Sequence, residues 1–394
     1  MSAAGAAPRP TVLPFAAISF AYFAYAGLFS TYAPLWFQSL GYSTFAIGVL
    51  TALQSATRIF SPYAWGWLAD HAHRRERLLR IAAGASLLAS TGYFVPHGYL
   101  WVAMVTLVLF VATAGVLPIS EALLAERVSS GGSLDVERYG RVRVWGSFGF
   151  IVAVAASGFL LQAAGVARFP LLTAALLALL LLAAWNLSPA SQPSHDLAPG
   201  AATLAVLRRP AVAWFFAGIF LTVLAHTSLY AFYSLYLASL GFGKGEIGML
   251  WAVGVVAEVA WFWFQGRWLR RWSMHKWLVL AALASALRFA LTAAFGGWVL
   301  VLVVTQCLHA LTFAAQHSAC IVVITRHFPG RLRGRGQALY AVLGYGVSGV
   351  VGGIGGGALS QVFGFAAVFW AAAGVALAAA WCCRQALRCE RRGD

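Results

Sequence analysis

Charged residues are scarce in this sequence. Only 10% of its 394 residues are Asp, Glu, Lys or Arg, and only 11 are acidic. The mean hydropathy of +0.79 is far above that of a soluble domain. No Walker loop, HExxH or GxSxG segment occurs, so nothing in the sequence supports ATP-driven transport or hydrolysis. We therefore expect a membrane protein that is not an enzyme.

Paired cysteines and metal-binding spacings are also missing. None of the five cysteines lies in a CxxC pair, and no histidine lies near one at metal-ligand spacing. Residues 1–13 contain one Arg and lack a small-residue cleavage site after a short apolar core. We expect no disulfide framework, no metal site, no cofactor and no removable signal peptide.

Apolar runs long enough to cross a bilayer fill the chain, at roughly 20 residues a crossing. They cover residues 14–39, 44–68, 78–95, 99–125, 139–162 and 169–186, and then 211–240, 246–264, 277–295, 299–325, 336–363 and 365–383. Only SPASQPSHDLAPG, at 188–200, has the composition of an interior linker. We predict an all-α integral membrane protein with twelve transmembrane helices. Residues 1–187 would form one six-helix bundle, 188–210 a cytoplasmic linker, and 211–394 a second six-helix bundle with a short basic tail.

The basic residues predict the orientation of these helices. With the N-terminus inside, all but four of the 27 Lys and Arg residues fall on the cytoplasmic side. Arg168 and Lys244 fall outside, while Arg58 and Arg288 lie within spans. Cytoplasmic loops hold an excess of Lys and Arg, so both termini are predicted to be cytoplasmic. The net charge of +16 then reflects topology, and we expect no nucleic-acid partner.

The two halves contain an internal repeat. SLGYSTFAIGVL at 39–50 aligns without a gap with SLGFGKGEIGML at 239–250, sharing Ser-Leu-Gly and Ile-Gly-x-Leu. Two related halves around a midplane site are typical of secondary transporters. A receptor or scaffold, the alternative from another class, would not need such a repeat.

The loop after the second run contains GWLADHAHRR, with Gly66, Asp70, Arg74 and Arg75. This spacing resembles the signature loop of the major facilitator superfamily. Asp70 would accept hydrogen bonds at the N-terminal end of a neighbouring helix, as a conformational latch. The alternative is a topology anchor. The second half has Arg270 in place of the aspartate.

Two further segments, SEALLAERVS at 120–129 and YGRVRVWGSFGF at 139–150, resemble the lactose permease and related proton symporters. The resemblance implies that Glu121 and Arg143 hold the substrate. Both residues fall in the cytoplasmic third of their helices, so a pair between them is feasible. Alternatively, Arg143 snorkels to the membrane interface.

Ionisable residues inside the spans give the strongest functional signal. Arg58, Glu258, Arg288 and His309 lie about 15–21 Å along their helices, near the midplane. Charges in spans usually face a cavity and find partners there. The same resemblance places Arg288 and His309 in a proton-coupling group, with Arg288 also binding substrate. The glutamate expected one turn after the histidine is Thr312, so Glu258 is the best substitute as proton carrier. The alternative is a structural ion pair between Arg58 and Glu258.

The segment 309–353 resembles the bacterial phenylpropionate permease family within the same superfamily. The likeness rests on TF-x-x-x-H at 312–317, RHFPG at 326–330, RGQALY at 335–340 and, more weakly, AHTSLY at 225–230. His226 and His317 are candidate cavity residues. A histidine with a satisfied hydrogen bond inside a helix bundle explains each of them equally well.

Glycines and prolines predict where helices pack and bend. Gly352-x-x-x-Gly356 and Gly353-x-x-x-Gly357 have close-packing spacing. Pro34, Pro62 and Pro118 lie inside apolar runs, where a proline can kink a helix.

We therefore predict a proton-coupled secondary transporter that imports a small organic solute by alternating access. Arg58, Arg143 and Arg288 outnumber Glu121 and Glu258, so the cavity would favour an anion, and the resemblance suggests an aromatic carboxylate of phenylpropionate type. The alternatives are a sugar or nucleoside symporter and an exporter of small apolar compounds. We expect a monomer in the bacterial inner (cytoplasmic) membrane, with the proton gradient as driving force.

Overall fold

The computed structural model describes residues 12–95, 97–130, 133–188 and 200–392, and within them the chain is almost wholly helical. Most of the predicted linker, residues 189–199, lies outside the described residues. The first half consists of α1 (Leu13–Ser39), α2 (Thr44–His71), α3 (Arg75–Ser90), the 3-10 turn η1 (Thr91–Phe94), α4 (Gly98–Thr113), α5 (Val116–Val128), the paired strands β1 (Ser129–Ser130) and β2 (Ser133–Leu134), α6 (Val136–Ala164), η2 (Val166–Arg168) and α7 (Phe169–Trp185).

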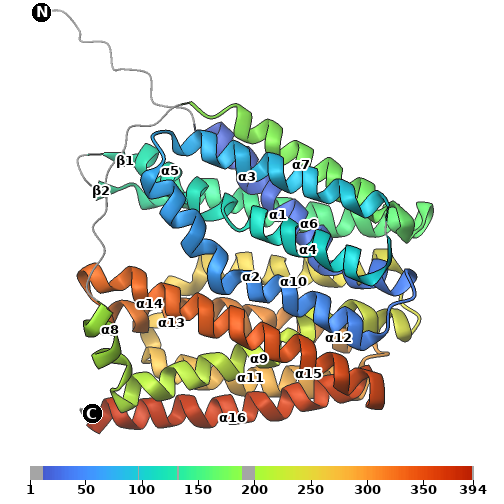
Figure 1. Cartoon of the computed structure of the whole chain (residues 1–394). Coiled ribbons are helices and arrows are strands. Elements are labelled where there is room, and N and C mark those ends of the chain that lie inside the picture. Colours follow the sequence, from blue (N-terminus) through green and yellow to red (C-terminus); the bar gives the residue numbers. More distant parts are fainter. Residues whose placement is uncertain (1–11, 96, 131–132, 189–199, 393–394) are drawn as a thin grey trace, which may run out of the picture.

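The second half begins with a short helix that the sequence did not suggest. Its elements are α8 (Gly200–Leu207), α9 (Pro210–Ser239), α10 (Lys244–Trp268), η3 (Leu269–Arg271), α11 (Met274–Phe295), α12 (Val299–Cys307), η4 (Ala310–Ala315), α13 (Gln316–His327), η5 (Gly330–Leu332), α14 (Arg333–Leu339), η6 (Tyr340–Val347), α15 (Ser348–Phe363) and α16 (Phe365–Arg392). The segments η4 and η6 are π-helices. In Figure 1 most of the first half lies above most of the second half, and α2 and α10 lie between them at similar height.

Ten helical segments within the described residues are long and apolar enough to cross a membrane. Two of the predicted runs, 44–68 and 78–95, are not among them. The run 44–68 forms α2, whose hydropathy is lowered by Gln54, Ser55, Thr57 and Arg58 close together in the sequence. The run 78–95 lies mostly in α3, which has only 16 residues. The protein is an all-helical membrane protein, because backbone groups in lipid must be satisfied within helices.

The predicted run 99–125 is broken into α4 and α5. Pro118 has no N–H to donate to the carbonyl of Ala114, so the helical ladder is interrupted there. Trp65 of α2 fills the break: its Nε1 donates to the Val111 carbonyl at 2.7 Å, and its ring lies against Gly115. The predicted kink at Pro118 is confirmed as a break, whereas α1 and α2 continue through Pro34 and Pro62.

The internal repeat is confirmed by the backbone. Helices α1 and α9 end at Ser39 and Ser239, and α2 and α10 start five residues later in each half. Between them Gly41 and Gly241 have φ angles of 83° and 92°, a left-handed conformation that glycine adopts without steric strain. The α1–α2 and α9–α10 turns therefore have the same length and the same backbone conformation at their glycine.

The halves meet through glycine contacts between α2 and α15. A methyl group on Gly48 would collide with the carbonyl of Gly353 and lie 2.9 Å from the Cα of Gly357. The other face of α15 packs on α9, where Gly352 lies against Thr227 and Gly356 against Phe232. The predicted packing role of both Gly-x-x-x-Gly pairs is thus confirmed.

A matching contact joins α6 to α10 across the halves. Gly158 approaches the Lys244 carbonyl, and Gly248 approaches the Val154 carbonyl. The hydroxyl of Tyr32 donates to both of these carbonyl oxygens, at 3.2 and 2.6 Å. Because Gly48 and Gly248 are equivalent positions of the repeat, the two contacts close the same end of the molecule symmetrically.

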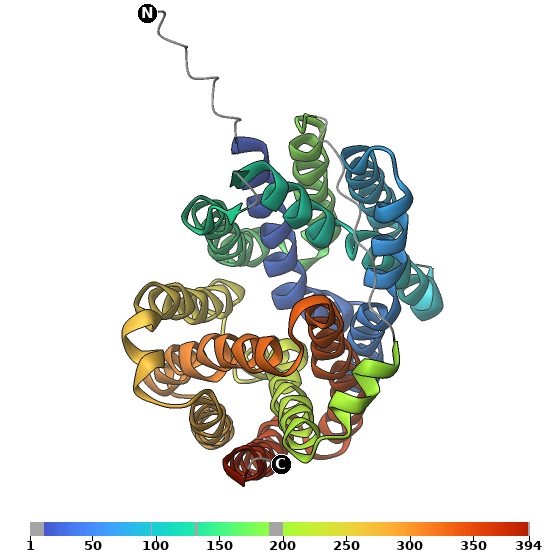
Figure 2. The same ribbon diagram turned by 90° about the vertical axis from the view of Figure 1, so that its left-hand side faces the viewer.

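The other end, which we call the basic end, is defined by the α2–α3 connection with Arg74 and the η3 turn with Arg270. In Figure 1, β1, β2, α8 and the end of α16 lie on that side, and Figure 2 views it directly. Gly66 and Gly266 occupy equivalent positions near this end, and a methyl group on either would meet no atom within 4 Å. The halves therefore touch closely at the end opposite the basic end, and their equivalent glycines near the basic end are free of such contacts.

A bulky residue at Gly48 should prevent this end from closing. We expect Gly48→Leu to abolish steady transport while leaving substrate binding by the purified protein intact, because the leucine cannot fit against the α15 backbone. Uptake by vesicles and equilibrium binding would be measured together, with Gly374→Leu, at an exposed glycine of α16, as the matched control. Transport by Gly48→Leu at the parental rate would contradict this interpretation.

Candidate functional site

Arg288 lies at the centre of a polar cluster inside the second half. Its side chain is 1% exposed on α11. It donates hydrogen bonds to Nδ1 of His309 at 2.6 Å, to the Thr312 hydroxyl at 3.1 Å and to the Gln306 amide oxygen at 2.9 Å. Arg288 therefore anchors the α12–η4 segment through three neutral acceptors and pairs directly with no carboxylate in the described part of the chain.

His309 connects this arginine to Glu258 of α10. Its Nε2 lies 2.8 Å from Oε1 of Glu258. A guanidinium group can only donate, so Nδ1 of His309 must accept from Arg288, and the ring proton must lie on Nε2 and point at the glutamate. The structure thus brings together three of the four predicted midplane residues, in the order Arg288, His309, Glu258.

Side chains of the two π-helices and of α13 continue from this cluster. His309, Phe313 and His317 stack in succession, with ring centroids 5.2 and 6.1 Å apart. The His317 Nδ1 lies 3.0 Å from the Tyr340 hydroxyl, which lies 3.1 Å from that of Tyr345. Wide turns of this kind are common at functional sites because they change which side chains face inward.

His226 faces a pocket of the second half. Its Nδ1 lies 2.8 Å from the Thr222 carbonyl and must donate to it, which leaves Nε2 as an acceptor that is buried and unpartnered. The pocket contains about 200 Å³ of empty space, open solvent included, and is lined by Thr222, Val223, His226, Tyr230, Thr312, Phe313, Gln316 and Tyr345.

Glu121 and Arg143 form an ion pair between α5 and α6, as their positions in the sequence suggested. The guanidinium group of Arg143 also lies 5.7 Å from the ring centre of Phe23. Both charged side chains line a second pocket, with about 250 Å³ of empty space including open solvent. Arg143 is therefore only partly buried, with a carboxylate and an aromatic ring as neighbours. Whether the pair contacts substrate stays a prediction.

Arg58 differs from the other two arginines of the site. It is exposed, and the structure shows neither a hydrogen bond nor an ion pair for it among the described residues. It lies close enough to Tyr22, Tyr230 and Tyr345 to interact with each electrostatically. Since Glu258 pairs with His309, the alternative of a structural ion pair between Arg58 and Glu258 is not found.

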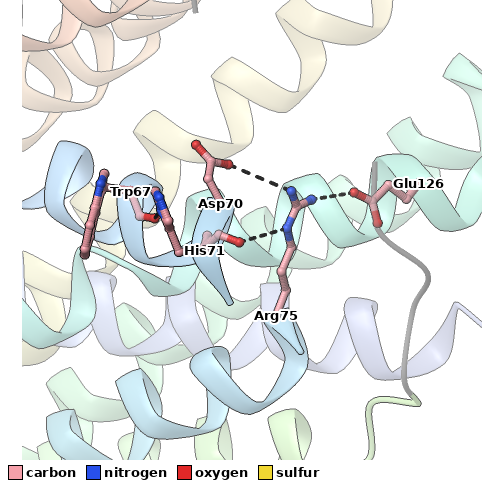
Figure 3. Close-up of polar contacts among 6 residues, drawn as sticks. Trp67, Asp70, His71, Arg75 and Glu126 are labelled. Atoms are coloured by element: carbon pink, nitrogen blue, oxygen red, sulfur yellow. Dashed lines mark hydrogen bonds and ion pairs between the residues drawn. The ribbon is translucent and has the colours of Figure 1, made fainter. Parts of the chain in front are cut away.

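Figure 3 shows the predicted latch. Arg75 donates to Glu126 of α5 at 2.6 Å and to the Ala69 carbonyl at 3.3 Å, while its contact with Asp70 is 3.9 Å. The Asp70 side chain is 50% exposed. Among the described residues no helix N-terminus donates a hydrogen bond to Asp70, because Arg75, the first residue of α3, attracts the carboxylate instead. The latch role of Asp70 stays a prediction. Arg74 makes no side-chain cap at α3.

Glu126, which the sequence did not suggest, is the nearer carboxylate partner of Arg75, and we expect its removal to affect transport more than that of Asp70. We expect Glu126→Gln to change the transport rate roughly fivefold, because a short charged hydrogen bond is worth about 1 kcal/mol when partly exposed. Asp70→Asn should change it less than about twofold, since long exposed pairs contribute little. Initial uptake rates and equilibrium binding would be compared in both variants. A larger effect of Asp70→Asn would contradict this assignment.

Several further residues of the site could be recognised only weakly from the sequence. Gln306 lies one helical turn before His309, and Tyr340 ends the RGQALY segment. Tyr22, Tyr230 and Tyr345 belong to a large aromatic population, from which no pattern singled them out.

This chain resembles known proteins in its family, in its sequence and in its fold. Residues 13–371 match the MFS_1 like family. The chain is 28% identical to the probable 3-phenylpropionic acid transporter of Escherichia coli (strain K12), over 91% of this chain and 94% of the relative. It is also 28% identical to the maltose permease of Geobacillus stearothermophilus, over 87% of this chain and 86% of that one. The crystal structure of the nucleoside transporter NupG matches the fold with a TM-score of 0.84 at 18% identity, over 95% of this chain and 98% of that one.

Proposed function

This chain belongs to the MFS_1 like family and is a secondary transporter of the major facilitator superfamily, and we propose that it imports an aromatic carboxylate together with a proton. Members of this family are transporters, not enzymes, and they carry small molecules across the membrane. The observation that carries the proposal is Arg58, a charged side chain that interacts electrostatically with three tyrosines and has no ion-pair partner among the described residues.

Arg58 is the carboxylate ligand in this proposal. The other two arginines of the site are already engaged, Arg143 by Glu121 and Arg288 by His309, Thr312 and Gln306. A guanidinium fork matches a carboxylate in geometry and charge. Arg143 shares electrostatic contact with Tyr22, so it adds to the positive potential around the same place. Arg288 acts as a positioning residue for His309.

The tyrosines supply the aromatic part of the site. Tyr22 comes from α1, Tyr230 from α9 and Tyr345 from η6, so both halves contribute a tyrosine within electrostatic range of Arg58. Aromatic side chains favour an aromatic ligand through edge and stacking contacts. The relative named as a phenylpropionic acid transporter supports the same ligand class.

Glu258 carries the proton in this proposal, with His309 as its hydrogen-bonding partner. The Nε2–H of His309 can donate to the carbonyl oxygen of a protonated Glu258 as well as to the carboxylate. Protonation therefore changes the charge of the pair and keeps their contact. An anionic substrate at Arg58 adds one negative charge to the site, and a proton on Glu258 adds one positive charge. Binding both leaves the net charge of the site unchanged, which couples the transport of the substrate to that of the proton.

Alternating access follows from the two-half construction. We propose that residues 1–187 and 211–394 are the moving bundles, that 188–210 is the cytoplasmic linker, and that α2 and α3 complete a set of twelve spans with both termini in the cytoplasm. The basic end is then cytoplasmic, and the glycine contacts close the outer side. The protein would act as a monomer in a bacterial cytoplasmic membrane, as the bacterial relative suggests.

Competition binding tests the ligand class. Purified protein would be offered 3-phenylpropionate, the corresponding alcohol 3-phenylpropanol, maltose and a nucleoside. We expect the carboxylate to bind at least about tenfold more tightly than the alcohol, because only the carboxylate makes charge-assisted hydrogen bonds with Arg58. Preferential binding of maltose or of the nucleoside would favour the alternative, in which Glu121 and Arg143 recognise hydroxyl groups.

A further inference from the structure

A second polar cluster lies at the basic end of the second half, away from the transport site. It consists of His275, the second residue of α11, His327, the last residue of α13, and Glu390, near the end of α16. One nitrogen from each histidine and one carboxylate oxygen all lie within 4.8 Å of one another. Three helices therefore converge on one point through groups that ligate metals.

Two histidine nitrogens of this cluster are buried without a hydrogen-bond partner among the described residues. The side chain of His275 is 1% exposed; its Nδ1 faces Glu390, whereas its Nε2 has no partner there. The Nε2 of His327 is also buried and unpartnered. A buried polar group that is left unsatisfied loses the hydrogen bonds it would make with water, which destabilises the folded protein. The cluster therefore needs something that the side chains alone do not supply.

A proton would satisfy only part of this need. Glu390 Oε2 lies 2.5 Å from Nδ1 of His275, so a protonated His275 could form an ion pair there. That pair would leave Nε2 of His275 and Nε2 of His327 without partners. A metal ion, in contrast, takes a lone pair from each imidazole and from the carboxylate at once.

We propose that His275, His327 and Glu390 bind a single zinc-like divalent cation that fastens the end of α16 to α11 and α13. Two imidazoles and one carboxylate leave a fourth tetrahedral position for water. Glu390 is 34% exposed, which gives the ion a route to the site.

The surrounding charges indicate which metals fit. Arg326 lies close enough to interact with both histidines, and Arg209 with His327. Positive neighbours oppose cations that are held mainly by charge and by oxygen ligands, such as Ca²⁺ and Mg²⁺. Imidazole ligands favour Zn²⁺, Ni²⁺ or Cu²⁺. We expect zinc to bind and calcium and magnesium not to compete.

Zinc binding by the purified full-length protein, prepared without a polyhistidine tag, tests the site. Titration calorimetry with ZnCl2 should give one ion per chain, and zinc should raise the thermal unfolding midpoint. His275→Ala and Glu390→Gln should each weaken binding by at least about 100-fold, since even the loss of outer-shell partners costs about 10–100-fold. His97→Ala, which removes an exposed histidine before α4, should bind zinc like the parent.

Cobalt gives an independent readout. Co²⁺ at a tetrahedral site absorbs visible light strongly, and this absorption should disappear in Glu390→Gln, a variant that keeps the size of the side chain. Absence of zinc binding by the parent, or binding that both substitutions leave unchanged, would overturn the proposal. The cluster would then be a histidine–glutamate ion pair.

Discussion

Arg58→Gln is expected to lower the affinity for 3-phenylpropionate by about 100-fold, which corresponds to about 3 kcal/mol of charge-assisted hydrogen bonds. The arginine has no ion pair to lose among the described residues, so its removal should leave the fold intact. Equilibrium binding to the purified protein measures the effect directly. Arg58→Lys should restore part of the affinity, because lysine keeps the charge without the planar fork.

A matched control separates a specific contact from a general loss of positive charge. Arg77→Gln removes an exposed arginine from the first turn of α3 and changes the net charge by the same amount. It should bind substrate like the parent. Equal affinity losses in both variants would show that long-range charge, not a direct contact, accounts for the effect. If Arg58→Gln binds 3-phenylpropionate as tightly as the parent, the residue that binds the carboxylate is Arg143 or Arg288.

Glu258→Gln should abolish accumulation driven by a proton gradient while leaving substrate exchange intact. A difference of one pH unit stores about 1.4 kcal/mol per proton, so the parent can accumulate substrate up to about tenfold at that gradient. Glutamine still accepts a hydrogen bond from Nε2 of His309, so the local geometry should persist. The variant cannot carry a proton, and its accumulation ratio should fall to about one.

Exchange and accumulation would be measured on the same vesicles. Glu137→Gln is the matched control, because Glu137 is exposed at the start of α6 and pairs with Arg141. It should accumulate substrate like the parent. If Glu258→Gln also accumulates substrate normally, the proton carrier is Glu121 or His309.

The sequence predicted those features that depend on composition and local spacing. Ionisable residues inside apolar runs are rare enough to stand out, and Glu258, Arg288 and His309 do lie in one hydrogen-bonded cluster. The Gly-x-x-x-Gly spacing in α15 predicted close helix packing for the same reason: few side chains allow backbones to approach. Glu121 and Arg143 were paired from a resemblance and from similar depth in adjoining helices.

Other features depend on contacts that the sequence does not encode locally. The π-helices that turn Phe313 and Tyr345 toward the site have no compositional signal. Glu126 pairs with Arg75 from a different helix, and the three residues of the proposed metal site come from three separate helices. The partner of Glu258 is His309 and not Arg58, the alternative that the sequence leaves open, and Arg288 binds the other side of the imidazole ring.

Uptake of labelled 3-phenylpropionate by vesicles that contain only the purified protein is the most direct test of the central claim. With the outside more acidic than the inside, the substrate should accumulate above its external concentration, and a protonophore should abolish the accumulation. The same vesicles should not accumulate 3-phenylpropanol, maltose or a nucleoside. Uptake of 3-phenylpropionate that is indifferent to the pH gradient, or gradient-driven accumulation of a neutral substrate in its place, would contradict proton-coupled import of an aromatic carboxylate.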